Sequence, residues 1–332
     1  MMDIVCMQNS KNYRIIYLLK IIYDIYYMDW ISIILIIIIL IILVIFVHDV
    51  YSVEGYKNTS IRENIDESIE ESIKDPRPKL WIYWENKKDE QMPSYIKLCQ
   101  DSIYRHCSDS FNIIKLDEKN IYDYLPELKE KNLNLSKLLI AQKVDYYRVL
   151  LLQKFGGLYL DLDIIVLNDP IEITDKLKDY DYVGFGCTGN KCSYGYGKPS
   201  NGIMASRANG KLMTNVLKNI ESKLQNNKGK KWDYFDLGKL VIWEEIDKLS
   251  KSENYKYYHY SNDYDGTRDI HGHWVNTPVL FSNMNLVYKH PEKMIFLVMY
   301  NSGMDQYKKM SEYELLNSDM NISKFFRRAV LE

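Results

Sequence analysis

The sequence predicts an α/β domain in which a mixed sheet is flanked by helices. Residues 79–116 predict strand, helix and strand, because residues 79–84 are aromatic and β-branched, a helical apolar stripe follows, and residues 111–116 are apolar again. Residues 143–170 predict a helix that ends at a glycine pair and leads into a strand. A β-α-β opening of this kind places ligands at the carboxyl ends of its strands.

Length and charge limit the possible organisation and partners. The chain has 332 residues, enough for one large α/β domain after an N-terminal part is set aside. Its formal net charge of -2 provides no basic surface for a polyanion. We therefore expect no nucleic-acid partner.

The central helix carries a charged pair on one face. Apolar residues recur at helical spacing between Val144 and Leu152, and the pair Gly156 and Gly157 supplies a stop. Asp145 and Arg148 are three residues apart, so a helix brings them to the same face. This helix leads directly into the most acidic part of the predicted sheet.

After the glycines the sequence period changes to two, which predicts a strand from residue 158 to residue 164. One side of it is apolar, and the other carries Tyr159, Asp161 and Asp163. Acids at i and i+2 are about 6.5 to 7 Å apart at the backbone, so they can serve one hard divalent cation directly or through water. The D-x-D spacing is weak alone, because it recurs at 179–181 and 263–265.

The whole pattern is more specific: D-x-x-R, a Leu-rich helix, then GG-x-Y-x-D-x-D. It resembles the DxD-containing glycosyltransferases of GT-A fold, nearest to family 32 of initiating mannosyltransferase type and the capsular polysaccharide synthesis proteins, more distantly the glucosylating bacterial toxins. A second block, WIYWEN followed by MPSYIKLCQDSI, resembles the opening of the same families. The resemblance implies a Rossmann-like mixed sheet of GT-A type flanked by helices, and hexosyltransferase activity of class EC 2.4.

The resemblance also implies roles for individual residues. Asp145 and Arg148 match residues that contact the nucleotide sugar, while Asp161 and Asp163 match acids that bind ribose and a Mn²⁺ or Mg²⁺ ion. These four are the catalytic candidates, and Tyr159 joins them as a donor-binding candidate. The cation would act as a Lewis acid on the departing nucleotide diphosphate, and retention of anomeric configuration is implied.

Three further positions are candidates outside the central stretch. Trp84 follows a predicted strand and either stacks on the nucleotide base or is a rim aromatic. Asn201 opens a predicted strand at 201–206 and is a possible donor contact. His271 or His273 is a candidate further metal ligand beside Asp163, although two histidines do not make a zinc site.

The segment DYFD at 233–236 precedes another predicted helix. The related families have a comparable aspartate and aromatic segment at this place. Asp233 or Asp236 orients the sugar in one interpretation, and Asp236 caps the helix in the other.

The N-terminal part predicts a membrane anchor. Residues 31–47 contain no charge, and at about 1.5 Å per residue they cover roughly 26 Å as a helix. A cleaved signal peptide is the alternative, but the segment starts late and lacks a small-residue cleavage site. Residues 1–30 then form a cytosolic or interfacial segment, 48–75 a polar stem, and 76–332 the catalytic domain.

Orientation is weakly encoded. Three basic residues shortly precede the span and two soon follow it, which favours a cytosolic N-terminus and a type II, single-pass protein with its domain lumenal or extracytoplasmic. In such a compartment Cys99 could pair with Cys107 and Cys187 with Cys192. Buried free thiols are the equal alternative.

Together these observations favour a membrane-anchored, metal-dependent glycosyltransferase of glycan biosynthesis. It would move a sugar from a nucleotide-sugar donor to a glycan or protein acceptor. Two alternatives stay open: a sugar-phosphate transferase, and a catalytically silent anchored binding protein.

Overall fold

The computed structural model describes residues 38–39, 41–44, 74–86, 90–131, 133, 135–186, 197–227, 229, 231–253, 255–299 and 304–332. The chain divides into two compact units, Met1–Ser68 and Ile69–Glu332, and the fold below is that of the second unit. Residues 38–39 and 41–44 are helical, while the rest of the predicted span lies outside the described residues. Among the residues described, no helix is long and apolar enough to cross a membrane. The anchor therefore stays a prediction.

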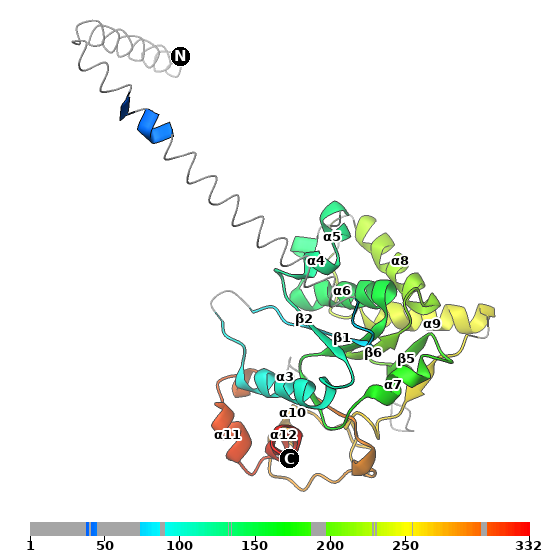
Figure 1. Cartoon of the computed structure of the whole chain (residues 1–332). Helices are drawn as coiled ribbons and strands as arrows, with labels where there is room; N and C mark the ends of the chain where they lie inside the picture. The colour runs from blue at the N-terminus through cyan, green and yellow to red at the C-terminus, as the bar shows by residue number, and fades with distance from the viewer. Residues whose placement is uncertain are drawn as a thin grey trace, which may run out of the picture. The chain divides into compact units, whose positions relative to one another are not determined.

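The centre of the domain is a six-stranded mixed sheet with the order β2-β1-β3-β6-β5-β7 (Figure 1). Strand β1 pairs in parallel with β2 and β3, β6 runs antiparallel between β3 and β5, and β5 is parallel to β7. The strands are β1 Lys79–Tyr83, β2 Asn112–Leu116, β3 Gly157–Asp161, β5 Tyr182–Phe185, β6 Ile203–Ser206 and β7 Tyr258–Tyr260. This architecture confirms the predicted α/β class with a mixed sheet.

The predicted β-α-β opening is confirmed. Strands β1 and β2 are parallel neighbours, and helix α3, Ser94–Cys107, connects them. The predicted apolar stripe of α3 is buried at Ile96, Cys99, Ile103 and Cys107. Cys99 and Cys107 are free thiols, as the second interpretation predicted. Eight residues of helix separate them by about 12 Å, well beyond the reach of a disulfide.

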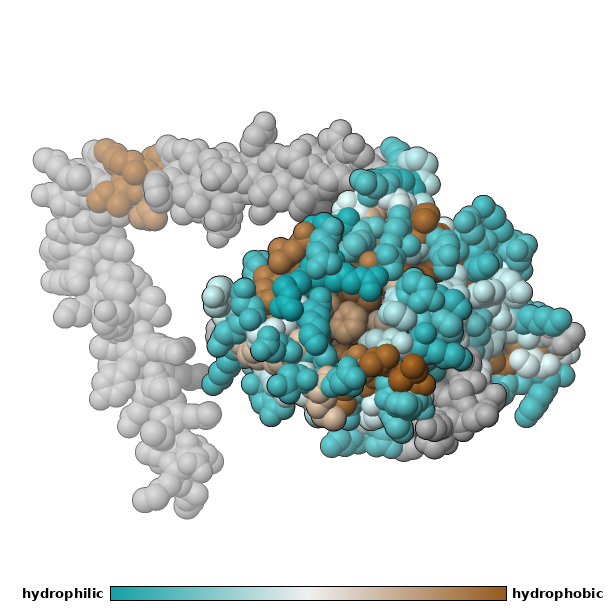
Figure 2. Space-filling view, turned by 90° about the horizontal axis from the view of Figure 1, so that it is seen from below, coloured by the Kyte–Doolittle hydropathy of each residue, from teal (hydrophilic) through white to brown (hydrophobic). Residues whose placement is uncertain are grey.

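Helices cover both faces of the sheet, so each central strand is buried on two sides. Alternate residues face two cores: Leu80 and Leu158 pack toward α3, whereas Trp81 and Tyr159 pack toward the opposite layer. That layer contains α6 Ile140–Phe155, α8 Lys211–Gln225 and α9 Lys239–Glu253 (Figure 1). The outer face seen in Figure 2 is largely hydrophilic, with hydrophobic side chains in separate patches.

The predicted continuous strand from 158 to 164 is wrong. Strand β3 ends at Asp161, a turn follows at 162–163, and β4 Ile164–Val166 belongs to a second sheet, where it pairs antiparallel with β8 Phe296–Val298. Leu162 in the turn is buried like Leu160 before it and Ile164 after it, so the period of two continues across the break and cannot reveal it. The chain therefore changes direction at Asp161 and Asp163, the two predicted acids.

Short helices complete the domain, and the C-terminal ones return to α3. Both α11 and α12 pack against α3, and Lys97 of α3 forms an ion pair with Glu312 of α11 at 3.0 Å. The short elements are α4 Ile121–Tyr124, α5 Glu127–Glu130, η1 Leu135–Lys137, α7 Ile171–Lys176, α10 Thr277–Leu280, η2 Pro291–Lys293, η4 Asp305–Tyr307, α11 Glu312–Asn317 and α12 Asn321–Val330. The start of α11 thus lies at the N-terminal end of α3, whereas the end of α12 lies at its C-terminal end, where Arg105 donates to the carbonyl of Val330 at 3.0 Å.

The glycine pair does more than stop the helix. Gly157 has φ +100°, and a Cβ there would clash with the carbonyl oxygen of Lys79 on the neighbouring strand β1. The carbonyl of Gly156 accepts a hydrogen bond from the buried indole of Trp81 at 2.8 Å. Strand β1 and the start of β3 therefore approach too closely for a side chain between them.

We expect Gly157→Ala to lower the free energy of unfolding by about 3 kcal/mol or more, since it combines a positive φ with a backbone clash. Gly197→Ala is a matched control, because Gly197 has φ +69° with open space around it and should lose about 1 kcal/mol. Urea unfolding of both variants measures the difference. Equal losses would show that the close approach of β1 and β3 contributes nothing.

Candidate functional site

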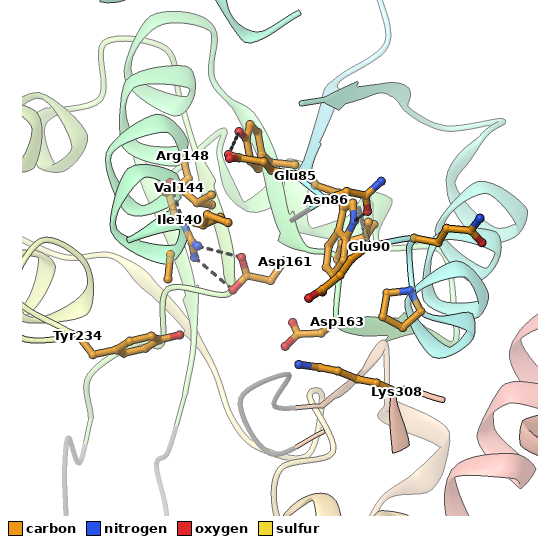
Figure 3. A pocket seen from close by; sticks show the side chains of 16 residues that line it. Glu85, Asn86, Glu90, Ile140, Val144, Arg148, Asp161, Asp163, Tyr234 and Lys308 are labelled. Carbon is orange, nitrogen blue, oxygen red and sulfur yellow. Dashed lines mark hydrogen bonds and ion pairs between the residues drawn. The ribbon is translucent and has the colours of Figure 1, made fainter. Parts of the chain in front are cut away.

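A cavity of about 280 Å³ opens at the carboxyl ends of β1 and β3, the central parallel strands. This is the sheet edge at which the β-α-β opening predicted a ligand. Figure 3 shows its charged side chains converging from several segments. The lining residues are Tyr83, Trp84, Glu85, Asn86, Glu90, Gln91, Pro93, Ile140, Ala141, Val144, Arg148, Asp161, Leu162, Asp163, Tyr234 and Lys308.

Arg148 is the buried cation of this site. Its Nη2 lies 2.9 Å from Oδ1 of Asp161, its Nη1 donates to Oδ2 of the same carboxylate at 3.2 Å, and its Nη2 lies 3.6 Å from Oδ1 of Asp145. Nη1 also donates to the backbone carbonyl of Asn201. The structure thus brings together three of the four predicted catalytic residues, through a two-pronged pair of the kind that fixes a guanidinium.

Tyr159 lies beneath this pair rather than in the cavity. It is 1% exposed, its ring lies 4.8 Å from Cζ of Arg148, and its hydroxyl donates to Asp161 at 3.4 Å. Tyr159 is not among the residues that line the cavity, and its contact with a donor stays a prediction. The period of two placed it correctly on the face of Asp161, but α6 covers that face along the strand and leaves the strand end open.

Asp145 and Asn201 lie behind Arg148. Asp145 is buried, accepts a hydrogen bond from Nδ2 of Asn201 at 2.7 Å, and is absent from the lining of the cavity, as is Asn201. Gly238 packs so closely on both side chains that a Cβ there would clash with them. These contacts let Asp145 and Asn201 position Arg148, and their direct contact with a donor stays a prediction.

Burial raises the pKa of Asp145 to about 7, against the opposing effects of the Arg148 guanidinium and the amide of Asn201. The second nearby carboxylate, Asp161, adds to the rise. A neutral carboxylic acid is cheaper to bury than an anion. Near pH 7, Asp145 therefore changes charge next to the main cation of the site.

Asp161 and Asp163 both line the cavity, one at the end of β3 and one in the following turn. The carbonyl of Asp163 accepts from the backbone N–H of Met299 at 3.1 Å, which holds this turn. Figure 3 shows the Lys308 ammonium extending toward Asp163 from the C-terminal segment, where Lys308 also pairs with Asp305 at 2.5 Å.

Two carboxylates facing an open cavity fit a hard divalent cation, whose preferred ligands are oxygens. Arg148 engages both oxygens of Asp161 and the Tyr159 hydroxyl donates to Oδ1, so Oδ2 keeps a further lone pair for an ion. Within the described part of the chain, no three His, Cys, Asp or Glu side chains form a metal-binding group. Asp161 and Asp163 would thus hold an ion together with water or ligand oxygens, and the metal stays a prediction.

The structure does not bring His271 or His273 into the cavity. Both are exposed, and the Asp269 carboxylate accepts from the backbone N–H groups of both residues at 2.9 and 2.7 Å. The ring of His273 also lies 3.2 Å from Asp269. Asp269 therefore closes this loop on itself at the surface, and neither histidine is among the residues that line the cavity.

The other sequence candidates have mixed outcomes. Trp84 lines the cavity, and its indole N–H donates to Asn86 at 2.7 Å. The carboxylate of Asp236 accepts from the backbone N–H of Asp233 at 2.8 Å. Helix α9 begins only at Lys239, so the helix-cap interpretation of Asp236 is wrong.

Sequence reasoning did not name Glu85, Glu90, Tyr234 or Lys308 among its site candidates, although all of them line the cavity. Glu85 could have been predicted as a site residue, because it lies two residues after the end of β1, at the ligand-binding edge of the sheet. It pairs with Lys143 at 3.1 Å and accepts from the Tyr83 hydroxyl at 2.8 Å. Tyr234 belongs to the DYFD segment that the resemblance singled out for its aspartates, whereas Lys308 comes from a distant segment without a local pattern that predicts its placement.

The pKa of Asp145 predicts an unusual dependence of stability on pH. Its pKa is about 7 in the folded protein and about 3.9 in the unfolded chain, so the folded state binds the additional proton between these values. The free energy of unfolding should therefore fall as pH rises from about 4 to 7, by up to about 4 kcal/mol. Asp145→Asn should remove this contribution in urea unfolding of the metal-free protein. The same pH dependence in both proteins would contradict it.

Known proteins were compared with this chain and its fold. The structure of GlyE from Streptococcus pneumoniae is 12% identical over 77% of this chain and 61% of that chain, with a TM-score of 0.41. The bifunctional glycosyltransferase WbbM is 12% identical over 78% and 50%, with a TM-score of 0.43. The PaToxG glycosyltransferase is 17% identical over 59% and 78%, with a TM-score of 0.37. These TM-scores are too low to carry an argument.

The family comparison is more informative. No curated protein matches the sequence significantly. A model of the capsular polysaccharide synthesis protein family matches residues 52–316, a range that contains every residue lining the cavity. The chain therefore belongs to the capsular polysaccharide synthesis protein family.

Proposed function

We propose that this protein is a metal-dependent glycosyltransferase that moves a sugar from a nucleotide-sugar donor to a glycan or glycoprotein acceptor. The observation that carries the proposal is the buried Arg148–Asp161 pair beside Asp163, at the carboxyl ends of two parallel strands. A fixed guanidinium and two carboxylates facing one cavity suit a diphosphate and its cation. Membership of a polysaccharide synthesis family supports sugar chemistry.

In this proposal Arg148 stabilises the leaving group. Its guanidinium lines the cavity and is held by Asp161, Asp145 and the Asn201 carbonyl, so it needs no rearrangement when negative charge develops on the diphosphate. A Mn²⁺ or Mg²⁺ ion bound by Asp161 and Asp163 would supply further positive charge. Trp84 provides an aromatic surface on the β1 side for the nucleotide base. We also propose retention of anomeric configuration, which the resemblance to family 32 supports.

The first experiment measures nucleotide release by the full chain from UDP- and GDP-sugars with Mn²⁺. We expect release from one donor, and a fall of about 100-fold or more for Asp163→Asn or after addition of EDTA, because the cation would be lost. Asp179→Asn is a matched control. Asp179 is exposed and belongs to a D-x-D repeat outside the cavity, so this variant should behave like wild type.

The remaining outcomes separate the alternatives. A product heavier by a phosphosugar would identify a sugar-phosphate transferase, which uses the same grip on the diphosphate. No release from any donor, with no metal-dependent nucleotide binding, would favour a catalytically silent binding protein. Equal activity of Asp163→Asn and wild type would contradict the proposed metal site.

We further propose that residues 31–47 anchor the protein in a membrane, with the N-terminus cytosolic and the domain lumenal or extracytoplasmic. The described residues of this segment, 38–39 and 41–44, are helical, apolar and exposed. Exposed apolar side chains around a helix suit lipid. The proposal includes the stem at 48–75, whose residues up to 73 lie outside the described part of the chain.

The anchor can be tested by membrane fractionation. We expect the full chain to remain in the membrane pellet after alkaline carbonate extraction. Substituting Ile39→Arg and Leu43→Arg together should release it, since each arginine costs about 2.5 to 3.5 kcal/mol at the centre of a span. Wild-type protein in the supernatant would contradict the anchor.

A further inference from the structure

A short turn, residues 232–238, carries two exposed aromatic side chains at the edge of the cavity. Tyr234 is 53% exposed and Phe235 is 42% exposed. Tyr234 also lines the cavity together with Arg148 and Asp161, and Figure 3 shows its hydroxyl end extending toward Asp161. The ring of Tyr234 therefore contacts both the cavity and the solvent outside it.

Helix α6 holds this turn at both ends. Nε2 of Gln142 donates to the carbonyls of Trp232 and Asp233 at 3.4 and 3.2 Å. At the other end, Leu237 is fully buried and Gly238 packs against the side chain of Asp145. The exposure of Tyr234 is therefore imposed by the same helix that positions Arg148.

The two rings are not equivalent. They meet edge to face, with centroids 4.9 Å apart and an interplanar angle of 90°, a favourable arrangement that braces the ring of Tyr234. The Lys239 ammonium lies 3.6 Å from the centroid of the Phe235 ring and covers a face of it. Tyr234 is thus the better candidate for contact with a bound molecule.

Tyr234 and Trp84, the aromatic residue that follows β1, come from different segments of the cavity lining. Figure 3 shows Glu85, Asn86 and Glu90 on one side of Asp161 and Tyr234 on the other. Trp84 precedes Glu85 in the chain and serves the nucleotide on that side. A ring that extends from the cavity into solvent suits a ligand that itself continues out of the cavity. A glycan chain is such a ligand, whereas a donor sugar is enclosed next to the diphosphate.

We propose that Tyr234 is the stacking surface for the acceptor, and that this acceptor is a sugar ring of a glycan chain. This inference rests on the proposed transferase function. A pyranose presents an apolar C–H face and a rim of hydroxyls, which match the face and the hydroxyl of a tyrosine. Phe235 acts as a positioning residue that holds the ring of Tyr234.

The test compares Tyr234→Ala with Tyr234→Phe in the full chain, with UDP- or GDP-sugar as donor and a set of methyl glycosides and disaccharides as acceptors. Stacking predicts that Tyr234→Ala raises the KM for the saccharide by about ten-fold, and by much more than it raises the Kd for UDP or GDP. Tyr234→Phe keeps the ring and should restore most of the affinity. Tyr313→Ala is the control, because Tyr313 is 75% exposed on α11 and does not line the cavity.

A second measurement needs no turnover: saturation-transfer NMR of the same saccharides with UDP or GDP present. Tyr234-dependent binding without any nucleotide-sugar turnover would refute the proposed transferase and leave the saccharide site standing. Turnover with an unchanged saccharide KM in Tyr234→Ala would refute the acceptor surface alone. An equal loss of nucleotide and saccharide affinity would place Tyr234 in the donor site and also overturn the inference.

Discussion

The site depends on one ion pair, between the buried Arg148 of α6 and the partly exposed Asp161 at the end of β3. A guanidinium removed from water is tolerated only where charges and acceptors surround it, and loss of one partner typically costs about 3 to 5 kcal/mol. Here Asp161 supplies both carboxylate oxygens, while Asp145 and the backbone carbonyls of Asn201 and Val144 also face the guanidinium. The pair therefore fixes helix, strand and the segment before β6 in one arrangement.

The same pair links the fold to the proposed chemistry. Helix α6 packs along β1 and β3, so its first turns lie over the carboxyl ends of these strands. From there it presents Arg148 to the cavity, holds Asp145 behind it, and anchors through Gln142 the turn that carries Tyr234. A single helix thus positions the cation for a diphosphate and the aromatic ring proposed for the acceptor.

Sequence patterns predicted what depends on local spacing. The structure contains the predicted strand, helix and strand of residues 79–116. It also places Asp145 and Arg148 on one face of α6. The predicted strand from 158 to 164 failed, because two short buried strands in succession have the same period as one long strand. Alternation also placed Tyr159 on the face of Asp161, but it could not give the depth at which a helix covers that face.

The sequence by itself determined the α/β class, the helix-to-strand stretch and the acids that face one site, since these follow from residue spacing along a single segment. The tertiary structure decided which of these residues reach the cavity. It placed Asp145 and Asn201 behind Arg148, kept His271 and His273 at the surface, and brought in Tyr234 and Lys308. Such placements depend on how distant segments pack against one another, and no local periodicity records that packing.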